Sequence, residues 1–214
     1  LNTARRFLAG SGTQTAALGF GGGPPVVDNS EEYNGTAWTE GNNLNTARRE
    51  LAAAGIQTAA LGFGGASDSD DSESYNGTSW TEVANMNTGR DELGGIGTAT
   101  AALAVGGHPT NANNELYNGT AWTEVADINT GRHAMGAAGT STSGIIFGGN
   151  SGTAEAKSES WNGSAWTEVA DLSTAGNGGG SGNAAPNKEC IYFGRSPATA
   201  ATEEFTAVGT VAVD

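Results

Sequence analysis

The sequence predicts an all-β propeller fold with five blades, each made of four antiparallel strands. The first reason is a repeat: Tyr-Asn-Gly-Thr-(Ala/Ser)-Trp-Thr-Glu occurs three times, and Trp-Asn-Gly-Ser-Ala-Trp-Thr-Glu occurs once. The copies begin at Tyr33, Tyr75, Tyr117 and Trp161, with spacings of 42, 42 and 44 residues. A period of this length carried by aromatic residues is typical of a propeller blade. The second reason is glycine, which makes up 35 of 214 residues and recurs at fixed places, as turns and close packing require.

Alignment of the chain on its own period gives five repeats, which we expect to form a single propeller domain. They are residues 1–43, 44–85, 86–127, 128–171 and 172–214. Leu1 falls on a repeat boundary, and the chain has neither an initiator methionine nor a signal peptide. We therefore expect it to be a piece of a longer polypeptide or a trimmed form.

Each repeat reads as four short strands. The first is almost entirely Ala and Gly, as in Met135–Gly139. Small residues suit the crowded axis of a ring with few blades, which favours five. The second strand is apolar on both alternating faces, as in Thr58–Gly65, which is typical of a strand covered on both sides.

The third and fourth strands are joined by Asn-Gly, a strong hairpin signal because both residues accept a positive φ. If Asn-Gly forms a two-residue turn, Tyr75 pairs with Thr78, and Glu73 lies opposite Trp80. Tyr75 and Trp80 are then diagonal neighbours on one face and can touch. Burial of each Trp side chain contributes about 1.5–3 kcal/mol, which supplies much of the core.

Composition excludes several classes of partner. The net charge is −14, the pI is about 4.3, and Lys157 and Lys188 are the only lysines. Such a surface repels nucleic acid and anionic lipid headgroups. Cys190 is the only cysteine, so no intrachain disulfide forms, and no apolar run is long enough for a membrane span.

The layout of the repeats resembles the kelch repeat. Its landmarks here are a starting Arg, a hydrophobic run closed by Gly-Gly, a Glu-x-Tyr pair and a Trp several residues later, and they cover essentially the whole chain. Kelch propellers usually carry six or seven blades and longer units, so the resemblance implies a short-blade version. The amino-acid sequence of the blade also looks like repeats in marine phage and bacterial surface proteins.

The fifth repeat departs from this pattern. Thr210 replaces Trp, Gly176 replaces Arg, Gly194-Arg195 replaces Gly-Gly, and Phe205 stands in for Tyr. A terminal repeat that loses interior landmarks is typical of an end cap or a ring-closing blade. The first repeat keeps all of these landmarks, so the sequence leaves open whether further blades precede Leu1.

Charged residues recur at two positions of the repeat. A glutamate is present in all five repeats (Glu31, Glu73, Glu115, Glu159, Glu203) and an arginine in four (Arg5, Arg48, Arg90, Arg132). A ring of acids could line a channel or bind a cation. In kelch-like blades these positions correspond to an Arg–Glu contact between strands, and equivalent copies favour a scaffold. We therefore expect structural roles for Arg48, Glu73, Tyr75, Trp80, Arg90, Glu115, Tyr117 and Trp122.

Other chemical signals are weak. The segment Asp68–Ser72 offers oxygen ligands for Ca²⁺ but lacks the spacing of a calcium loop, which favours a solvated acidic loop. His108 and His133 occupy non-equivalent positions, without metal-ligand spacing. Four Asn-Gly-Thr/Ser sequons coincide with the hairpin turns, and the turn explains both residues. We expect no catalytic residue, metal or cofactor.

The repeats differ most after Gly-Gly, in the stretches 23–29, 66–71, 108–114 and 150–157. Divergent loops on one face of a constant scaffold are typical of a binding surface, although neutral drift in exposed turns also produces them. The candidate ligand-binding residues are Asp28, Asp68, Asp70, Asp71, His108, Asn111 and Asn113.

Two functions from different classes remain. The first is a non-catalytic structural or attachment module at a virion, phage tail or cell surface, whose partners are protein subunits or a surface glycan. The second is a glycan-active kelch-propeller or other propeller enzyme, similar to galactose oxidase or a sialidase. The oxidase needs Tyr, His and Cys ligands on a metal, and two histidines with one cysteine make that difficult. A sialidase needs three convergent arginines, whereas the arginines here belong to the repeat.

Overall fold

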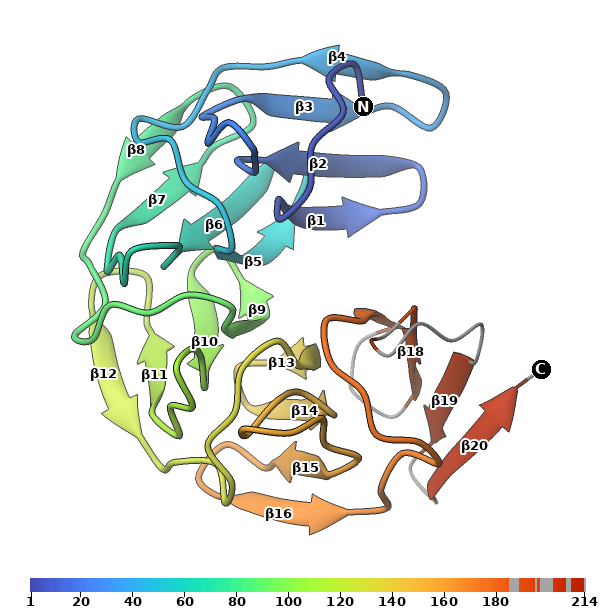
Figure 1. Ribbon diagram of the computed structural model, residues 1–214. Coiled ribbons are helices and arrows are strands. Elements are labelled where there is room, and N and C mark those ends of the chain that lie inside the picture. Colours follow the sequence, from blue (N-terminus) through green and yellow to red (C-terminus); the bar gives the residue numbers. More distant parts are fainter. Residues whose placement is uncertain (185–188, 195, 197–201, 207–208, 214) are drawn as a thin grey trace. The chain divides into compact units, whose positions relative to one another are not determined.

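The chain is an all-β propeller of five blades, seen in a computed structural model that describes residues 1–184, 189–194, 196, 202–206 and 209–213 (Figure 1). Each blade is a sheet of four strands, so the predicted fold class and number of blades are confirmed. No described segment is a helix that could span a bilayer.

The strands of each blade follow one another in sheet order, as in a meander. Blade 1 contains β1 (Ala9–Thr13), β2 (Ala16–Phe20), β3 (Ser30–Tyr33) and β4 (Trp38–Glu40). Blade 2 contains β5 (Ala52–Ile56), β6 (Ala59–Phe63), β7 (Ser72–Tyr75) and β8 (Trp80–Glu82). Blade 3 contains β9 (Gly94–Thr98), β10 (Ala101–Val105), β11 (Asn114–Tyr117) and β12 (Trp122–Val125). Blade 4 contains β13 (Gly136–Thr140), β14 (Ser143–Phe147), β15 (Ser158–Trp161) and β16 (Trp166–Val169). Blade 5 contains β17 (Gly180–Ala184), β18 (Glu189–Phe193), β19 (Thr202–Thr206) and β20 (Gly209–Val213).

The chain divides into two compact units, which are described separately. The N-terminal unit comprises residues 1–92, 98–102 and 117–123, and the C-terminal unit comprises residues 93–97, 103–116 and 124–214. Each of the five blades lies within one of the five sequence repeats.

The second strand of a blade is its most buried element. In β6 only Ala59 is exposed, and Ala60, Leu61 and Phe63 have no exposed surface. In β14, Ile145 and Ile146 are likewise fully buried. A strand in the middle of a sheet that is covered on both faces needs apolar residues at successive positions, as the sequence pattern indicated.

The hairpin between the third and fourth strands is longer than the two-residue turn considered from the sequence. Tyr75 pairs directly with Trp80 and Glu73 with Glu82, so four residues connect the strands. The Oδ1 atom of Asn76 accepts backbone N–H bonds from Thr78 at 2.9 Å and Ser79 at 2.9 Å. This Asx-type bonding holds residues 78 and 79 in the loop, which is why the two-residue register is wrong here. The expected ring contact is present, with centroids of Tyr75 and Trp80 5.0 Å apart.

Blade 2 packs on blade 1 through one aromatic arrangement, which we call the Trp junction. The Trp80 ring lies 4.6 Å from the ring of Phe20, between centroids, and its indole N–H donates to Ser30 Oγ at 3.1 Å. Phe20 and Ser30 face each other across β2 and β3. A Cβ added to Gly62 would lie 2.7 Å from the Phe20 ring, so glycine leaves room for that ring.

The Trp junction recurs between blades 2 and 3. The ring centroids of Trp122 and Phe63 are 5.0 Å apart, and the Trp122 indole N–H donates to Ser72 Oγ at 3.2 Å. Phe63 and Ser72 are again cross-strand partners. A buried aromatic pair stabilises the fold by more than its buried apolar area alone would give, and here the indole N–H is also hydrogen-bonded.

Blade 5 packs on blade 4 without a tryptophan, because position 210 is Thr. Instead, Phe147 stacks on Tyr192 with 6.1 Å between centroids and lies 5.9 Å from Phe205. Tyr192 occupies the β-strand position that Gly62 holds in blade 2. The larger residue at this position therefore fills space where the indole is missing.

Candidate functional site: the loops after the second strands

The loops that vary between repeats connect the second and third strands of each blade. In a meander these loops and the connections between blades lie at one edge of the sheet, and the hairpins lie at the other. The connections precede the first strand of each blade, and we call residues 44–51 and their equivalents the lead-in segments. The variable loops and the lead-in segments therefore share an edge.

Each variable loop starts at Gly-Gly, and both glycines have positive φ. In blade 1, Gly21 has φ 66° and Gly22 has φ 109°. A Cβ on Gly21 would lie 2.5 Å from the carbonyl oxygen of Arg48, the arginine of the next repeat. The equivalent Gly106 has φ 57° and would approach the carbonyl oxygen of Arg132 equally closely, at 2.5 Å. Gly-Gly is thus required by backbone conformation and by close packing on the next blade.

Backbone hydrogen bonds fix the base of the loop to the next lead-in segment. Between blades 1 and 2, Gly22 N–H donates to Arg48 O at 2.8 Å, Arg48 N–H to Val27 O at 3.3 Å, and Leu44 N–H to Asp28 O at 2.9 Å. Equivalent bonds recur at three further junctions, from the loops 66–71, 108–113 and 150–157. One of these junctions involves Gly176, which replaces the arginine in repeat 5. The bonds still form there because they join backbone atoms only. The base of every variable loop is therefore built in the same way.

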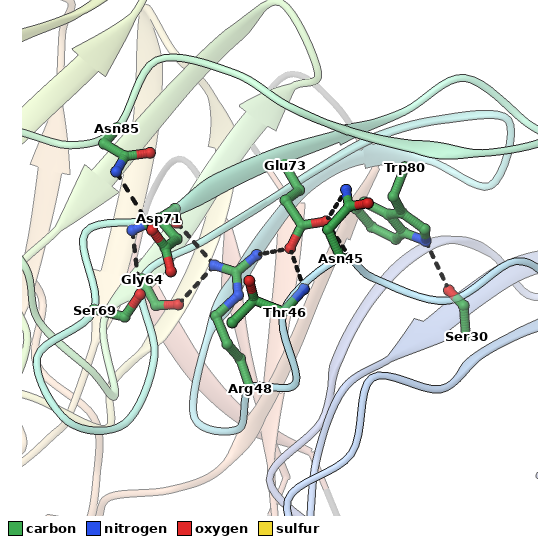
Figure 2. A network of polar contacts seen from close by, with 10 residues as sticks. All are labelled: Ser30, Asn45, Thr46, Arg48, Gly64, Ser69, Asp71, Glu73, Trp80 and Asn85. Atoms are coloured by element: carbon green, nitrogen blue, oxygen red, sulfur yellow. Dashed lines mark hydrogen bonds and ion pairs between the residues drawn. The ribbon is translucent and has the colours of Figure 1, made fainter.

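Arg48 also joins its own blade to this arrangement (Figure 2). Its Nη1 atom donates to the carbonyl oxygens of Gly64 at 3.0 Å and Asp71 at 2.8 Å, which lie at the two ends of the next variable loop. Its Nη2 atom pairs with Glu73 Oε1 at 2.8 Å. Since the Arg48 backbone holds the loop of blade 1 and its side chain holds the loop of blade 2, one residue couples both.

Glu73 in turn fixes the lead-in segment. Its Oε2 atom accepts from the backbone N–H of Asn45 at 2.7 Å and from Asn45 Nδ2 at 2.9 Å. Arg48 and Glu73 are both buried, with 3% and 1% of their surface exposed. A buried ion pair is tolerated where further hydrogen bonds satisfy its groups. Here both Glu73 oxygens and both terminal nitrogens of Arg48 have partners, whereas Arg48 Nε is buried with no partner among the described residues.

The Arg–Glu contact expected from the resemblance recurs within both units. Arg5 pairs with Glu31 in blade 1, and Arg132 pairs with Glu159 at 2.7 Å in blade 4. Arg90 and Glu115 are buried as well. Burial alone would raise the pKa of Glu31, but the Asn2 N–H, the Arg5 guanidinium and the N-terminal ammonium outweigh it, so its pKa lies below the ordinary value.

The remaining repeat positions have structural contacts. Tyr75 donates its hydroxyl to the Glu32 carboxylate of blade 1, and burial together with this carboxylate raises the pKa of Tyr75. Burial also raises the pKa of Tyr117, whose ring lies 5.1 Å from that of Trp122.

The candidate acidic residues of the N-terminal unit divide into two groups. Asp28 Oδ1 accepts from Asn43 Nδ2 at 3.2 Å, and Asp70 and Asp71 accept from Asn85 Nδ2 at 3.4 and 3.3 Å. Asn43 and Asn85 precede the lead-in segments, so these three carboxylates support the base of the loops. Asp68 lies at the tip of its loop and is exposed.

The candidates of the C-terminal unit divide similarly. The Oδ1 atom of Asn111 accepts from the N–H of Asn113 at 2.9 Å, and the N–H of Arg132 donates to Asn111 O at 3.2 Å. His108 is exposed, and its ring lies 5.3 Å from that of His133 in an edge-to-face arrangement. The tips are exposed in the other loops too, at residues 24–26 and 152–153.

Comparison with protein-family models and with curated proteins finds no match to this sequence. The assignment of the chain to the propeller architecture therefore rests on its five four-stranded sheets.

Sequence reasoning missed two features of this region. The first is the set of backbone bonds at the loop bases, for which the only signal was the Gly-Gly of the first four repeats. The second is an apolar groove of about 370 Å³ on blade 1, beside Trp38 and Gly19. Arg195, which replaces the second glycine in repeat 5, lies outside the described residues.

Proposed function

We propose that this chain is a non-catalytic attachment module of the kelch type, which binds a glycan or a protein partner through the tips of its variable loops. We place it at a virion, phage tail or cell surface. The observation that carries the proposal is the division of each loop into a base, fixed by hydrogen bonds that recur from repeat to repeat, and an exposed tip of variable sequence. Such a division lets the tip change without disturbing the scaffold.

Two observations favour this proposal over a propeller enzyme. The guanidinium groups of Arg48 and Arg132 are buried and paired with glutamates of their own repeats, so they serve the scaffold rather than an anionic sugar. Cys190 is buried, and burial raises the pKa of its thiol to about 12. A thiol in that environment stays protonated at neutral pH and is a poor copper ligand.

A glycan array probed with the purified chain tests the proposal. We expect saturable binding that falls on substitution of tip residues, with Asp68→Ala and His108→Ala as the variants. Thr78→Ala is the matched control, since Thr78 is exposed in the hairpin at the opposite edge of blade 2. Stoichiometric copper in metal analysis, or equal losses in the control, would contradict the proposal.

A further inference from the structure

The variable loops differ in the number of residues with which they turn back on Gly-Gly. In each of blades 1 to 4, one loop residue donates its backbone N–H to the carbonyl oxygen of the second glycine. The carbonyl oxygen of the same residue accepts from the backbone N–H at the arginine position of the next repeat, and we call it the closing residue. The closing residues are Val27, Ser69, Asn111 and Glu155, which lie five, four, four and six positions after the second glycine.

The two four-residue loops lie directly on a glycine of the next repeat. Gly89 and Gly131 immediately precede the repeat arginines of blades 3 and 4. A Cβ on Gly89 would lie 1.9 Å from the carbonyl oxygen of Asp68, the residue before the closing residue. A Cβ on Gly131 would lie 2.4 Å from the equivalent carbonyl oxygen of Thr110. Neither glycine has a positive φ, so the close approach of the loop, and not the backbone conformation, requires glycine here.

The wider loops meet alanine at the same position. Ala47 follows the five-residue loop of blade 1, and Ala175 follows the six-residue loop of blade 4, so a Cβ fits beside both loops. The residue before the arginine position is therefore Gly after a tight loop and Ala after a wider one. Loop length and this residue belong to different repeats, and the packing contact is what links them.

We propose that Gly89 and Gly131 are positioning residues of the binding surface, because each sets how closely a tight loop lies on the next blade. Asp68 illustrates the effect, since its carbonyl group lies on Gly89 and its side chain is exposed at the loop tip. A loop and the residue before the next arginine position then form one matched unit. The inference rests on the proposed function only in assigning ligand binding to the tips.

Substitution of single glycines tests the close approach. Gly89→Ala and Gly131→Ala should each lower the melting temperature by about 2–10 °C, because the added Cβ must displace the backbone of the loop. In Gly89→Ala, the NMR amide shifts of residues 66–69 should also change. Gly182→Ala is the matched control and should not lower the melting temperature, since a Cβ there would meet no atom of the described residues within 4 Å. An unchanged melting temperature in Gly89→Ala would overturn the proposal.

Exchange of a loop tests the match between loop length and residue. The six-residue segment 150–155 suits transplantation because its side chains bond within the loop, as where the Gly152 N–H donates to Asn150 Oδ1 at 2.8 Å. In a chimera that has this segment in place of residues 66–69, Gly89→Ala should no longer lower the melting temperature.

Two outcomes of the exchange would contradict the match. One is an equal loss of melting temperature from Gly89→Ala in the native chain and in the chimera. The other is a chimera that does not fold with either glycine or alanine at position 89, since the bonds at the loop base join backbone atoms only. Neither measurement involves a ligand, so a chain that binds no glycan would contradict the proposed function but not the match.

Discussion

Blades 1 and 2 contain nearly the same sequence, yet their tryptophans lie in different environments. Both have the Arg–Glu pair, and both pair Tyr directly with Trp across the third and fourth strands. Trp80 is buried because Phe20 and Ser30 of blade 1 receive it, whereas Trp38 is partly exposed. The aromatic core of this repeat therefore belongs to the junction between blades, as in other proteins whose repeats gain stability from their neighbours.

The largest expected effect comes from truncating the buried indole. Trp80→Ala should lower the free energy of unfolding by about 3–5 kcal/mol, since it leaves a cavity against Phe20. Trp38→Ala should cost less than about 2 kcal/mol, because that ring is already partly in water. Urea denaturation of the two variants measures the difference. Equal losses of unfolding free energy in the two variants would mean that packing at the junction does not determine how much each tryptophan stabilises the fold.

The close packing of Gly-Gly can be tested by substituting two glycines of nearly equal φ, one in Gly-Gly and one in the lead-in segment of repeat 5. Gly21 has φ 66° and Gly178 has φ 67°, but their surroundings differ. A Cβ on Gly21 would lie 2.5 Å from the Arg48 carbonyl oxygen, whereas a Cβ on Gly178 would meet no atom of the described residues within 4 Å. Gly178→Ala should cost about 1–2 kcal/mol from backbone strain alone. Gly21→Ala should cost about 1–3 kcal/mol more. Thermal unfolding of both variants tests whether close packing adds to the strain.

The hydroxyl of the Trp junction gives a smaller contrast. Ser30 Oγ accepts from the Trp80 indole at 3.1 Å, whereas Ser158 Oγ at the equivalent position of blade 4 is buried with no partner among the described residues. Repeat 5 has Thr210 where the other repeats have Trp. Ser30→Ala should therefore cost about 1–3 kcal/mol, because it leaves a buried donor unsatisfied. Ser158→Ala should change stability by less than about 0.5 kcal/mol in the same denaturation assay.

The pH dependence of stability sharpens the comparison within blade 1. The pKa of Glu31 is lower in the folded chain than its ordinary value of 4.5. The unfolded chain therefore binds the proton more readily, and the stabilisation that Glu31 contributes is full above pH 4.5 and falls as pH decreases below it. Glu31→Gln should reduce the slope of stability against pH in that acid range. If thermal melts at acid pH gave the same slope of stability against pH for the variant, a carboxyl other than Glu31 would cause the pH dependence.

The repeat period predicted the fold because each repeat forms one blade, so the number of repeats gives the number of blades. The apolar run Ala59–Phe63 and the ring contact of Tyr75 with Trp80 also followed from the sequence. The hairpin register did not, because Asn-Gly fits two loop lengths. The choice depends on whether the Asn76 side chain accepts bonds from residues 78 and 79, as it does here.

The candidate residues of the loops were harder to assign from sequence. Asp28, Asp70 and Asp71 look like free acids in the sequence, but asparagines beyond the next strands bond to them. Those partners lie 14 or 15 residues away, and no local pattern reports the contact. Asp68, Asp70 and His108 are exposed, whereas the other four candidates are partly buried. Of the three exposed residues, Asp68 and His108 lie at loop tips, and Asp70 is bonded to Asn85.

A double-mutant cycle on Phe20 and Trp80 tests the central claim, that one blade receives the tryptophan of the next. The two residues lie 60 positions apart and touch through rings 4.6 Å apart. Denaturation of both single variants to Ala and of the double variant should give a coupling energy of about 0.5–3 kcal/mol. Additive losses, with coupling within about 0.3 kcal/mol, would contradict the claim.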